Sequence, residues 1–322
     1  MKAAPVLDAS RTRTARAWIA PYGALGMVLL AAAWALSWSH VRPWSDFGFF
    51  PLWLGYIVTV DALVRPRLSR SLLGAGALPV FKVFAISAAM WWIFEAFNVR
   101  TANWEYLDAS PVSPLRLALE STIDFSTVLP AIFETAALLH AILPGPKEIR
   151  HELPPLPAGV AWISIAIGIV FLALPLVQPH FFFPLIWGSL FFVVDPVNAR
   201  LHRPSILASA LSGRWRPVLV LALAGITCGL FWEMWNSQSM PKWIYHVPLI
   251  PQQRLFEMPY LGYAGYLPFA LECFAFYTLA SYLWRAHGAP EPGTVSPYVP
   301  MVESGRAPVR ELRADMEGKV KG

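Results

Sequence analysis

The sequence predicts an all-α integral membrane protein with about eight transmembrane helices, arranged as two four-helix repeats in tandem and in parallel orientation. Two observations on composition and one on internal similarity predict this fold. Apolar residues (Ala, Val, Ile, Leu, Met, Phe, Trp, Tyr and Cys) make up 56% of the 322 residues. Only 14% are charged, whereas soluble domains carry about a quarter. The third observation is that the second half of the chain repeats motifs of the first half.

The low content of charged residues also excludes several classes of partner. The formal net charge of +5 comes from basic residues that are scattered over short loops and form no patch, so no nucleic-acid partner is expected. The expected partners are membrane lipids and a lipid-soluble small molecule. The two cysteines, Cys228 and Cys273, both lie in apolar segments. Neither a disulfide framework nor a metal site is predicted from them, and no cofactor is expected.

Eight apolar segments have about the length that a membrane crossing needs, which is roughly 20 residues. They are 18–38, 48–64, 76–98, 121–143, 158–178, 181–197, 215–236 and 261–284. This division predicts five regions along the chain. They are a cytoplasmic N-terminal segment (1–17), a first four-helix repeat (18–143), a cytoplasmic linker (144–157), a second four-helix repeat (158–286) and a disordered cytoplasmic tail (287–322).

The short loops predict the orientation, because Lys and Arg concentrate on the cytoplasmic side of a membrane protein. The N-terminal segment and the loops after the second, fourth and sixth crossings are basic, with residues such as Arg13, Arg67, Lys147 and Arg203. With eight crossings these loops share one side. Both termini are therefore expected in the cytoplasm, and the membrane is expected to be a bacterial-type inner membrane.

The duplication is predicted by motifs that recur in the same order and at a nearly constant offset along the chain. The matches are Phe49-Phe50-Pro51-Leu52 with Phe182-Phe183-Pro184-Leu185, Asp61 with Asp195, Phe94-Glu95-Ala96-Phe97-Asn98 with Trp232-Glu233-Met234-Trp235-Asn236, Trp104-Glu105-Tyr106 with Trp243-Ile244-Tyr245, and Pro130 and Glu134 with Pro268 and Glu272. The first and fifth segments match poorly and are expected at the periphery.

Carboxylates at membrane depth are the predicted catalytic residues, since charged side chains are costly in lipid and usually mark functional sites. Glu95 and Glu233 each precede an asparagine by three residues, on the same helical face. Glu134 and Glu272 are expected halfway through the membrane, one turn after a kink-forming proline. Unpaired acids in apolar surroundings hold protons, which predicts proton donors that share one chamber. The alternative is that these acids only hydrogen-bond across helices.

A second set of residues is predicted to bind the ligand, because these residues flank the glutamates or lie in the outer loops beside them. They are Asn98, Asn236, Trp104, Tyr106, Trp232, Trp243, Tyr245 and Glu257. For the aromatic residues of the outer loops, a belt at the lipid headgroups is the competing interpretation. Asp61 and Asp195 are expected to cap helices or to pair with nearby arginines.

The segment 229–276, with Phe256-Glu257-Met258-Pro259 followed by Pro268 and Glu272, resembles the small integral-membrane lycopene cyclases and the related carotenoid hydratases. Through the repeat, the resemblance extends to 91–138. The cyclase pattern of a proline followed closely by two adjacent glutamates is not present here. The resemblance implies an isomerase or lyase of carotenoid biosynthesis that needs no redox cofactor. In that chemistry a protonated Glu272 or Glu134 delivers a proton to an alkene, and Glu233 or Glu95 is the partner carboxylate.

Two other functions remain open from the sequence. A duplicated bundle with carboxylates near the membrane midplane is also typical of proton-coupled transporters. The dense aromatic content and plain loops are also compatible with a non-catalytic assembly or lipid-binding protein of the membrane. If one half of the duplication carries the function, the second half is favoured, because it holds the Trp-flanked Glu-x-x-Asn motif and the Phe-Glu-Met-Pro run.

Overall fold

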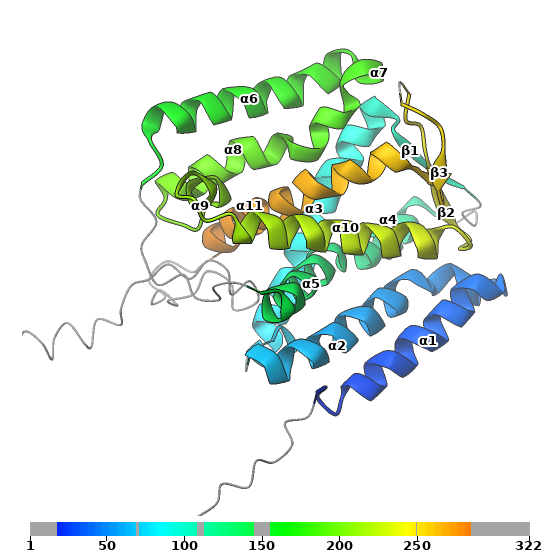
Figure 1. The fold of residues 1–322 in the computed structure, drawn as a ribbon. Coiled ribbons are helices and arrows are strands. Elements are labelled where there is room, and N and C mark those ends of the chain that lie inside the picture. The colour runs from blue at the N-terminus through cyan, green and yellow to red at the C-terminus, as the bar shows by residue number, and fades with distance from the viewer. Residues whose placement is uncertain (1–17, 69–70, 108–112, 145–154, 249, 285–322) are drawn as a thin grey trace, which may run out of the picture.

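The structure is a computed structural model, and it describes residues 18–68, 71–107, 113–144, 155–248 and 250–284. The predicted N-terminal segment, most of the linker and the C-terminal tail lie outside these residues. The described chain is mostly helical (Figure 1). Five of its segments are long and apolar enough to cross a membrane, namely Ala77–Thr101, Pro114–Ile142, Ala158–Val177, Pro179–Arg200 and Arg216–Asn236. By the length and composition of these helices, the chain is a helical membrane protein.

Each of the eight predicted segments is helical over most of its length. The longer helices are α1 (Gly23–Ser39), α2 (Phe49–Leu68), α3 (Ala77–Thr101), α4 (Pro114–Phe125), α5 (Val128–Ile142), α6 (Ala158–Val177), α8 (Ile186–Arg200), α10 (Arg216–Asn236) and α11 (Tyr266–Leu283). Short helices α7 (Pro179–Phe182) and α9 (Ile206–Leu211) and 3-10 turns η1 (Trp44–Phe47), η2 (Leu73–Ala75), η3 (Phe183–Leu185) and η4 (Tyr260–Gly265) connect them. α1, which has 17 residues, α2 and α11 are not among these five segments.

The predicted distortion before the prolines of the fourth and eighth segments takes the form of a break in regular α-helix. In the fourth segment α4 ends at Phe125 and α5 begins at Val128, so the break lies one turn before Pro130. In the break, Thr127 Oγ1 donates to the Asp124 carbonyl (2.7 Å), a local bond that competes with helix hydrogen bonds. Pro130 is then the third residue of α5, as Pro268 is of α11. The N–H groups of a first helical turn have no partner within the helix, so each proline fits directly after its break.

The helices pack in layers, and the order of the layers is the same on both sides of a central group of helices (Figure 1). α3, α5, α10 and α11 form the centre, where α5 contacts α3 and α10, and α11 contacts the same two helices. α2 packs on α5, and α8 packs on α11. α1 lies outside α2, and α6 lies outside α8. The expected peripheral position of the first and fifth segments is confirmed.

Two small antiparallel sheets cover one end of the bundle, and the all-α prediction missed them. β1 (Trp104–Leu107) pairs with β2 (Lys242–Tyr245), so that Trp104 lies opposite Tyr245 and Tyr106 opposite Trp243. β3 (Arg254–Leu255) pairs with β4 (Met258–Pro259). The two segments with the Trp-x-Tyr motif, far apart in sequence, therefore form one sheet.

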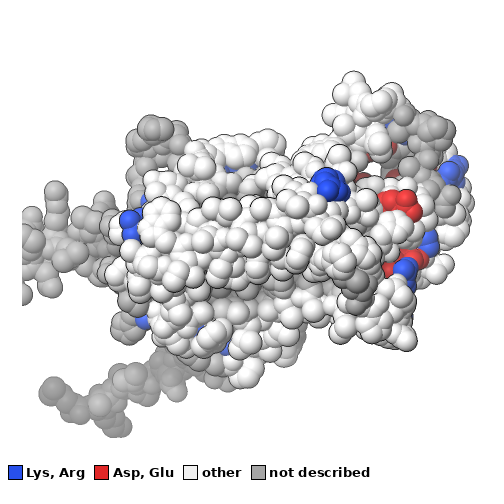
Figure 2. Space-filling view, turned by 90° about the horizontal axis from the view of Figure 1, so that it is seen from above, with Lys and Arg blue, Asp and Glu red and all other residues white. Residues whose placement is uncertain are grey.

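Acidic side chains are absent from the middle of the face that Figure 2 shows, and the red atoms gather at the end that bears the strands. The described basic residues of the predicted cytoplasmic loops, such as Arg65, Arg203 and Arg216, belong to the opposite end, where α2 and α8 finish and α10 begins. A mostly apolar outer face between two ends with charged residues is what a lipid bilayer requires.

We expect Gly225→Ala to destabilise the central packing of α10 on α11. A Cβ atom at Gly225 would lie 2.2 Å from the Tyr266 carbonyl oxygen, a backbone atom that cannot rotate away. Overpacking of this kind costs about 1–3 kcal/mol. The thermal unfolding midpoint of the purified protein in detergent should fall. Gly159→Ala in α6 is the matched control, since a Cβ atom there meets nothing within 4 Å. Equal midpoints for the two variants would contradict the close approach.

Candidate functional site

A cavity of about 840 Å³ lies at the end of the bundle that carries the strands. Its walls come from both halves of the chain: α3, α4 and β1 from the first half, and α10, β2, η4 and α11 from the second half. The lining is rich in aromatic residues, including seven tryptophans: Trp91, Trp92, Trp104, Trp187, Trp232, Trp235 and Trp243. The volume and the apolar walls are those of a small-molecule site.

Glu95 is the predicted catalytic residue that lines this cavity. Its Oε1 atom accepts three hydrogen bonds, from Trp91 Nε1 (3.0 Å), Trp104 Nε1 (3.2 Å) and the Tyr106 hydroxyl (2.6 Å). Trp91 is one helical turn before Glu95, and the other two donors come from β1. The three donors fix the orientation of this carboxylate at the cavity wall. The sequence predicted Glu95 as a partner carboxylate, and its position beside the cavity is compatible with that role.

Glu233 has the matching arrangement in the second half but lies behind the cavity wall. It is buried in α10, and its Oε1 atom accepts from the hydroxyls of Tyr245 (2.7 Å) and Tyr266 (2.6 Å). Trp243 Nε1 in turn donates to the Tyr245 hydroxyl (2.7 Å). Burial, and after it the Glu233 carboxylate, raises the pKa of Tyr245 well above its usual value. Tyr245 thus remains a hydrogen-bond donor at any physiological pH.

The side chains of Asn98 and Asn236 bind the backbone at the strands β1 and β2. They do not hydrogen-bond to Glu95 and Glu233, which share their helical faces. Asn98 Nδ2 donates to the Trp104 carbonyl (2.8 Å), and Asn98 Oδ1 accepts from the backbone N–H groups of Asn103 (2.8 Å) and Trp104 (3.2 Å). Asn236 Nδ2 donates to the Trp243 carbonyl (2.7 Å), and its Oδ1 accepts from the Trp243 N–H (2.9 Å). Each amide ties the first residues of a strand to the end of the preceding helix.

Glu134 and Glu272 are fully buried and line no part of this cavity. Glu134 Oε1 accepts from the Leu72 backbone N–H (2.9 Å), and Glu272 Oε1 accepts from the Leu190 backbone N–H (2.6 Å). The expectation that all four glutamates share one chamber is therefore not met by this cavity. The physical reason is that both glutamates accept hydrogen bonds from backbone groups where the chain leaves regular helix. Glu134 does so after α2, and Glu272 does so near Trp187, whose backbone angles are not helical.

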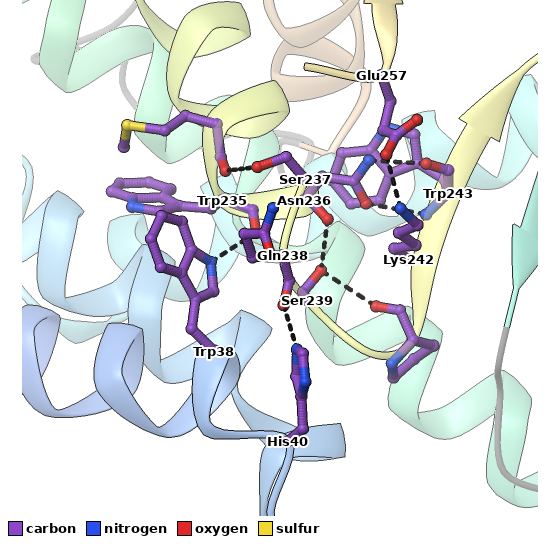
Figure 3. Close-up of polar contacts among 12 residues, drawn as sticks. Trp38, His40, Trp235, Asn236, Ser237, Gln238, Ser239, Lys242, Trp243 and Glu257 are labelled. Carbon is purple, nitrogen blue, oxygen red and sulfur yellow. Dashed lines mark hydrogen bonds and ion pairs between the residues drawn. The ribbon is translucent and has the colours of Figure 1, made fainter.

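Glu257 is likewise outside the cavity lining and has a structural partner. Lys242 Nζ lies 2.6 Å from Glu257 Oε1, which links β2 to the β3–β4 hairpin. Figure 3 shows this ion pair beside the loop that follows α10. The same view shows the end of α1 bound to that loop: Trp38 Nε1 donates to the Trp235 carbonyl (3.1 Å), and His40 Nε2 lies 2.7 Å from the Gln238 carbonyl.

Among the predicted ligand-binding residues, those that line the cavity are Trp104, Tyr106, Trp232, Asn236, Trp243 and Tyr245, whereas Asn98 and Glu257 do not. Asp61 and Asp195 lie elsewhere and cap the chain after α2 and α8. Asp61 Oδ2 accepts from the Leu73 N–H (2.8 Å), and Asp195 Oδ2 accepts from the Leu207 N–H (2.9 Å). Asp61 also accepts a hydrogen bond from the Tyr22 hydroxyl.

The sequence analysis missed three acidic residues of the cavity: Asp46, Glu120 and Asp124. Asp124 had a detectable signal, because it is a carboxylate inside a predicted membrane segment. Asp124 belongs to none of the repeated motifs, because the matching position of the second half is Gly262. On α4, the lining residues Leu117, Glu120, Ser121 and Asp124 recur at helical spacing and form one face.

Comparison with known proteins returned no match to any family model, to any curated protein or to any solved structure. Within the described ranges, His, Cys, Asp and Glu side chains form no group of three that could hold a metal ion. The interpretation of the site therefore depends on its own residues.

We expect Asn98→Ala and Asn236→Ala to loosen the β1–β2 sheet. Each substitution leaves backbone groups near the strand without their amide partner, which costs about 1–3 kcal/mol where the group is buried. Hydrogen–deuterium exchange of the peptides that contain 104–107 and 242–245 should become faster. Ser237→Ala is the control, because Ser237 Oγ donates only to the Met234 carbonyl within its own turn. Unchanged exchange in both asparagine variants would contradict this role.

Proposed function

We propose that the chain is a multi-pass membrane enzyme that carries out acid–base chemistry on a lipid-soluble small molecule in the cavity. The observation that carries the proposal is a carboxylate, Glu95, set in an aromatic cavity and held by three N–H and O–H donors. A merely structural acid would not need to line an open volume of about 840 Å³. The resemblance to lycopene cyclases and carotenoid hydratases suggests an isoprenoid-like lipid and a reaction that starts with a proton.

The roles of the two acids follow from their surroundings. Glu95, which three hydrogen bonds hold at the cavity wall, stabilises positive charge in the bound molecule. Asp124 receives a hydrogen bond from the Phe50 backbone, and no Lys, Arg or His among the described residues pairs with it. It is the candidate to give a proton to an alkene and to take one back. The attack of a second double bond on the cation then gives a ring, and the attack of water gives an alcohol.

The aromatic walls support the same chemistry. A cationic carbon in the cavity would lie among the faces and edges of Trp91, Trp104 and Trp187, whose rings already pack against one another and on Phe94. Cation–π attraction is worth about 2 kcal/mol or more when the site excludes water. The same apolar walls would accommodate the hydrocarbon part of a lipid.

For the topology we propose eight crossings in two tandem four-helix repeats, with both termini in the cytoplasm of a bacterial cell. Matched contacts support the duplication. Asp61 contacts the N–H of Leu73 and Asp195 that of Leu207, with the same spacing along the chain in each pair. The two Glu-x-x-Asn motifs hold matched strands that pair with each other. The basic loops at the end away from the strands support the orientation.

We expect Glu95→Gln and Asp124→Asn to lower product formation about 100-fold or more, because each removes a group that acts on the substrate. Glu134→Gln and Glu272→Gln are the controls, since neither side chain lines the cavity and both are expected to change stability instead. The measurement is mass spectrometry of lipids and pigments extracted from cells that express each variant at equal protein level.

Two outcomes would contradict the enzyme. If the extracts of cells with and without the gene are identical, no lipid product is formed. If Glu272→Gln abolishes the product while Glu95→Gln does not, the chemistry lies outside this cavity. Movement of an unchanged lipid into vesicles in response to a pH gradient would instead favour the transporter.

We expect Gln253→Cys to react with a membrane-impermeant thiol reagent in intact cells, and Leu211→Cys to react only after the membrane is opened. Both positions are exposed, and they lie at opposite ends of the bundle. Gln253 directly precedes β3, and Leu211 is the last residue of α9. Cys228 and Cys273 are fully buried and should stay unlabelled. Labelling of Leu211→Cys in intact cells would contradict the proposed orientation.

A further inference from the structure

The charged side chains that line the cavity all have the same sign. They are Asp46, Glu95, Glu120 and Asp124, and no Lys, Arg or His among the described residues lines the cavity with them. Arg42 and Arg116, which do not line the cavity, pair with Asp46 (3.5 Å) and Glu120 (2.6 Å). Glu95 and Asp124 face the same cavity without a basic partner in the described part of the chain.

A neutral ligand would leave the Glu95 carboxylate without a positive partner. Removal of a carboxylate from water is costly unless a positive charge or hydrogen bonds replace the water. Glu95 has its three donors, but they are neutral groups and leave its charge in place. An apolar tail that filled the cavity would expel water and raise this cost further. A ligand with a positive charge of its own would lower it.

The walls around Glu95 suit one kind of positive charge. Two of its donors, Trp91 and Trp104, are themselves lining residues, and Trp187 packs beside Trp104 with the ring centroids 5.7 Å apart. Tryptophan faces attract alkylated ammonium groups, which cannot use strong hydrogen bonds. A cage of aromatic rings with a carboxylate therefore selects an alkylammonium group over a metal ion.

The sign of the lining charges also excludes a phosphate group from the ligand. Its negative charge would meet the four acidic side chains of the cavity.

We infer that the ligand of this cavity is a cationic amphiphile, with an alkylammonium group against Glu95 and the tryptophans. This inference depends on the proposed function only in taking the cavity as the ligand site. Glu95 is then the counter-ion of the ligand, and Asp124 is the group that exchanges protons with it.

The test uses two esters that differ in one atom. Hexanoylcholine carries a quaternary nitrogen, and 3,3-dimethylbutyl hexanoate has carbon in its place with the same shape. Binding of each ester to the full-length protein in maltoside micelles is measured by quenching of tryptophan fluorescence. We expect the choline ester to bind about tenfold more tightly, the factor that a cation–π and ion-pair contact of modest strength gives.

Variants locate the charge preference. Glu95→Gln should reduce the preference for the choline ester to less than about threefold without loss of binding of the neutral ester. Glu105→Gln removes a carboxylate of β1 that is half exposed and outside the cavity, and it should keep the preference. Retention of the wild-type preference in Glu95→Gln, or its loss in Glu105→Gln, would overturn the assignment to this cavity.

The wild-type protein alone also decides the matter, so a variant that fails to fold does not block the test. Equal binding of the two esters overturns the inference but leaves the proposed function standing, because the cavity still takes a lipid-soluble molecule. Tighter binding of the neutral ester does the same. Binding of neither ester overturns the inference, and the lipid extracts described above then test the proposed function separately.

Discussion

Buried side-chain carboxylates and amides that satisfy the backbone where helices end are the interaction on which this structure depends. A bilayer provides no water for such groups, so each break in a helix needs an internal partner. Glu134 serves the turn after α2, Glu272 the irregular start of α8, and Asp195 the start of α9. Asn98 and Asn236 do the same for the two strands. Most of the polar residues inside the apolar segments are thus accounted for by the chain itself.

This constraint separates structural from functional acids more clearly than depth in the membrane does. Glu134, Glu233 and Glu272 have no exposed surface and lie behind the cavity wall. Glu95 has the same Glu-x-x-Asn motif as Glu233 but lines the cavity. The contrast within one motif, Glu95 against Glu233, arises because Tyr266 of α11 covers the second glutamate. The two halves of the site are therefore unequal, and the half that the sequence disfavours holds the exposed carboxylate.

Much of the helical framework could be predicted from the sequence, because apolar length and charged loops report directly on membrane helices. β1 and β2 could not, since each of these short strands pairs with a segment of the other half of the chain. The break before Pro130 could have been recognised, because proline near a helix start is as common a signal as a kink. For the site, Trp104, Tyr106 and Tyr245 were identified from their repeated spacing. Asp124 was not, because it has no repeated partner.

The pairing of β1 with β2 makes the two outer loops interdependent in length. Side chains alternate along a strand, and on β1 Trp104 and Tyr106 line the cavity while Glu105 does not. Loss of a single residue between α3 and β1 would slip the register and turn Glu105 inward in their place. A matching deletion before β2 would be needed to restore the sheet. Over evolutionary time the two loops should therefore gain or lose residues together, although they lie far apart in the sequence.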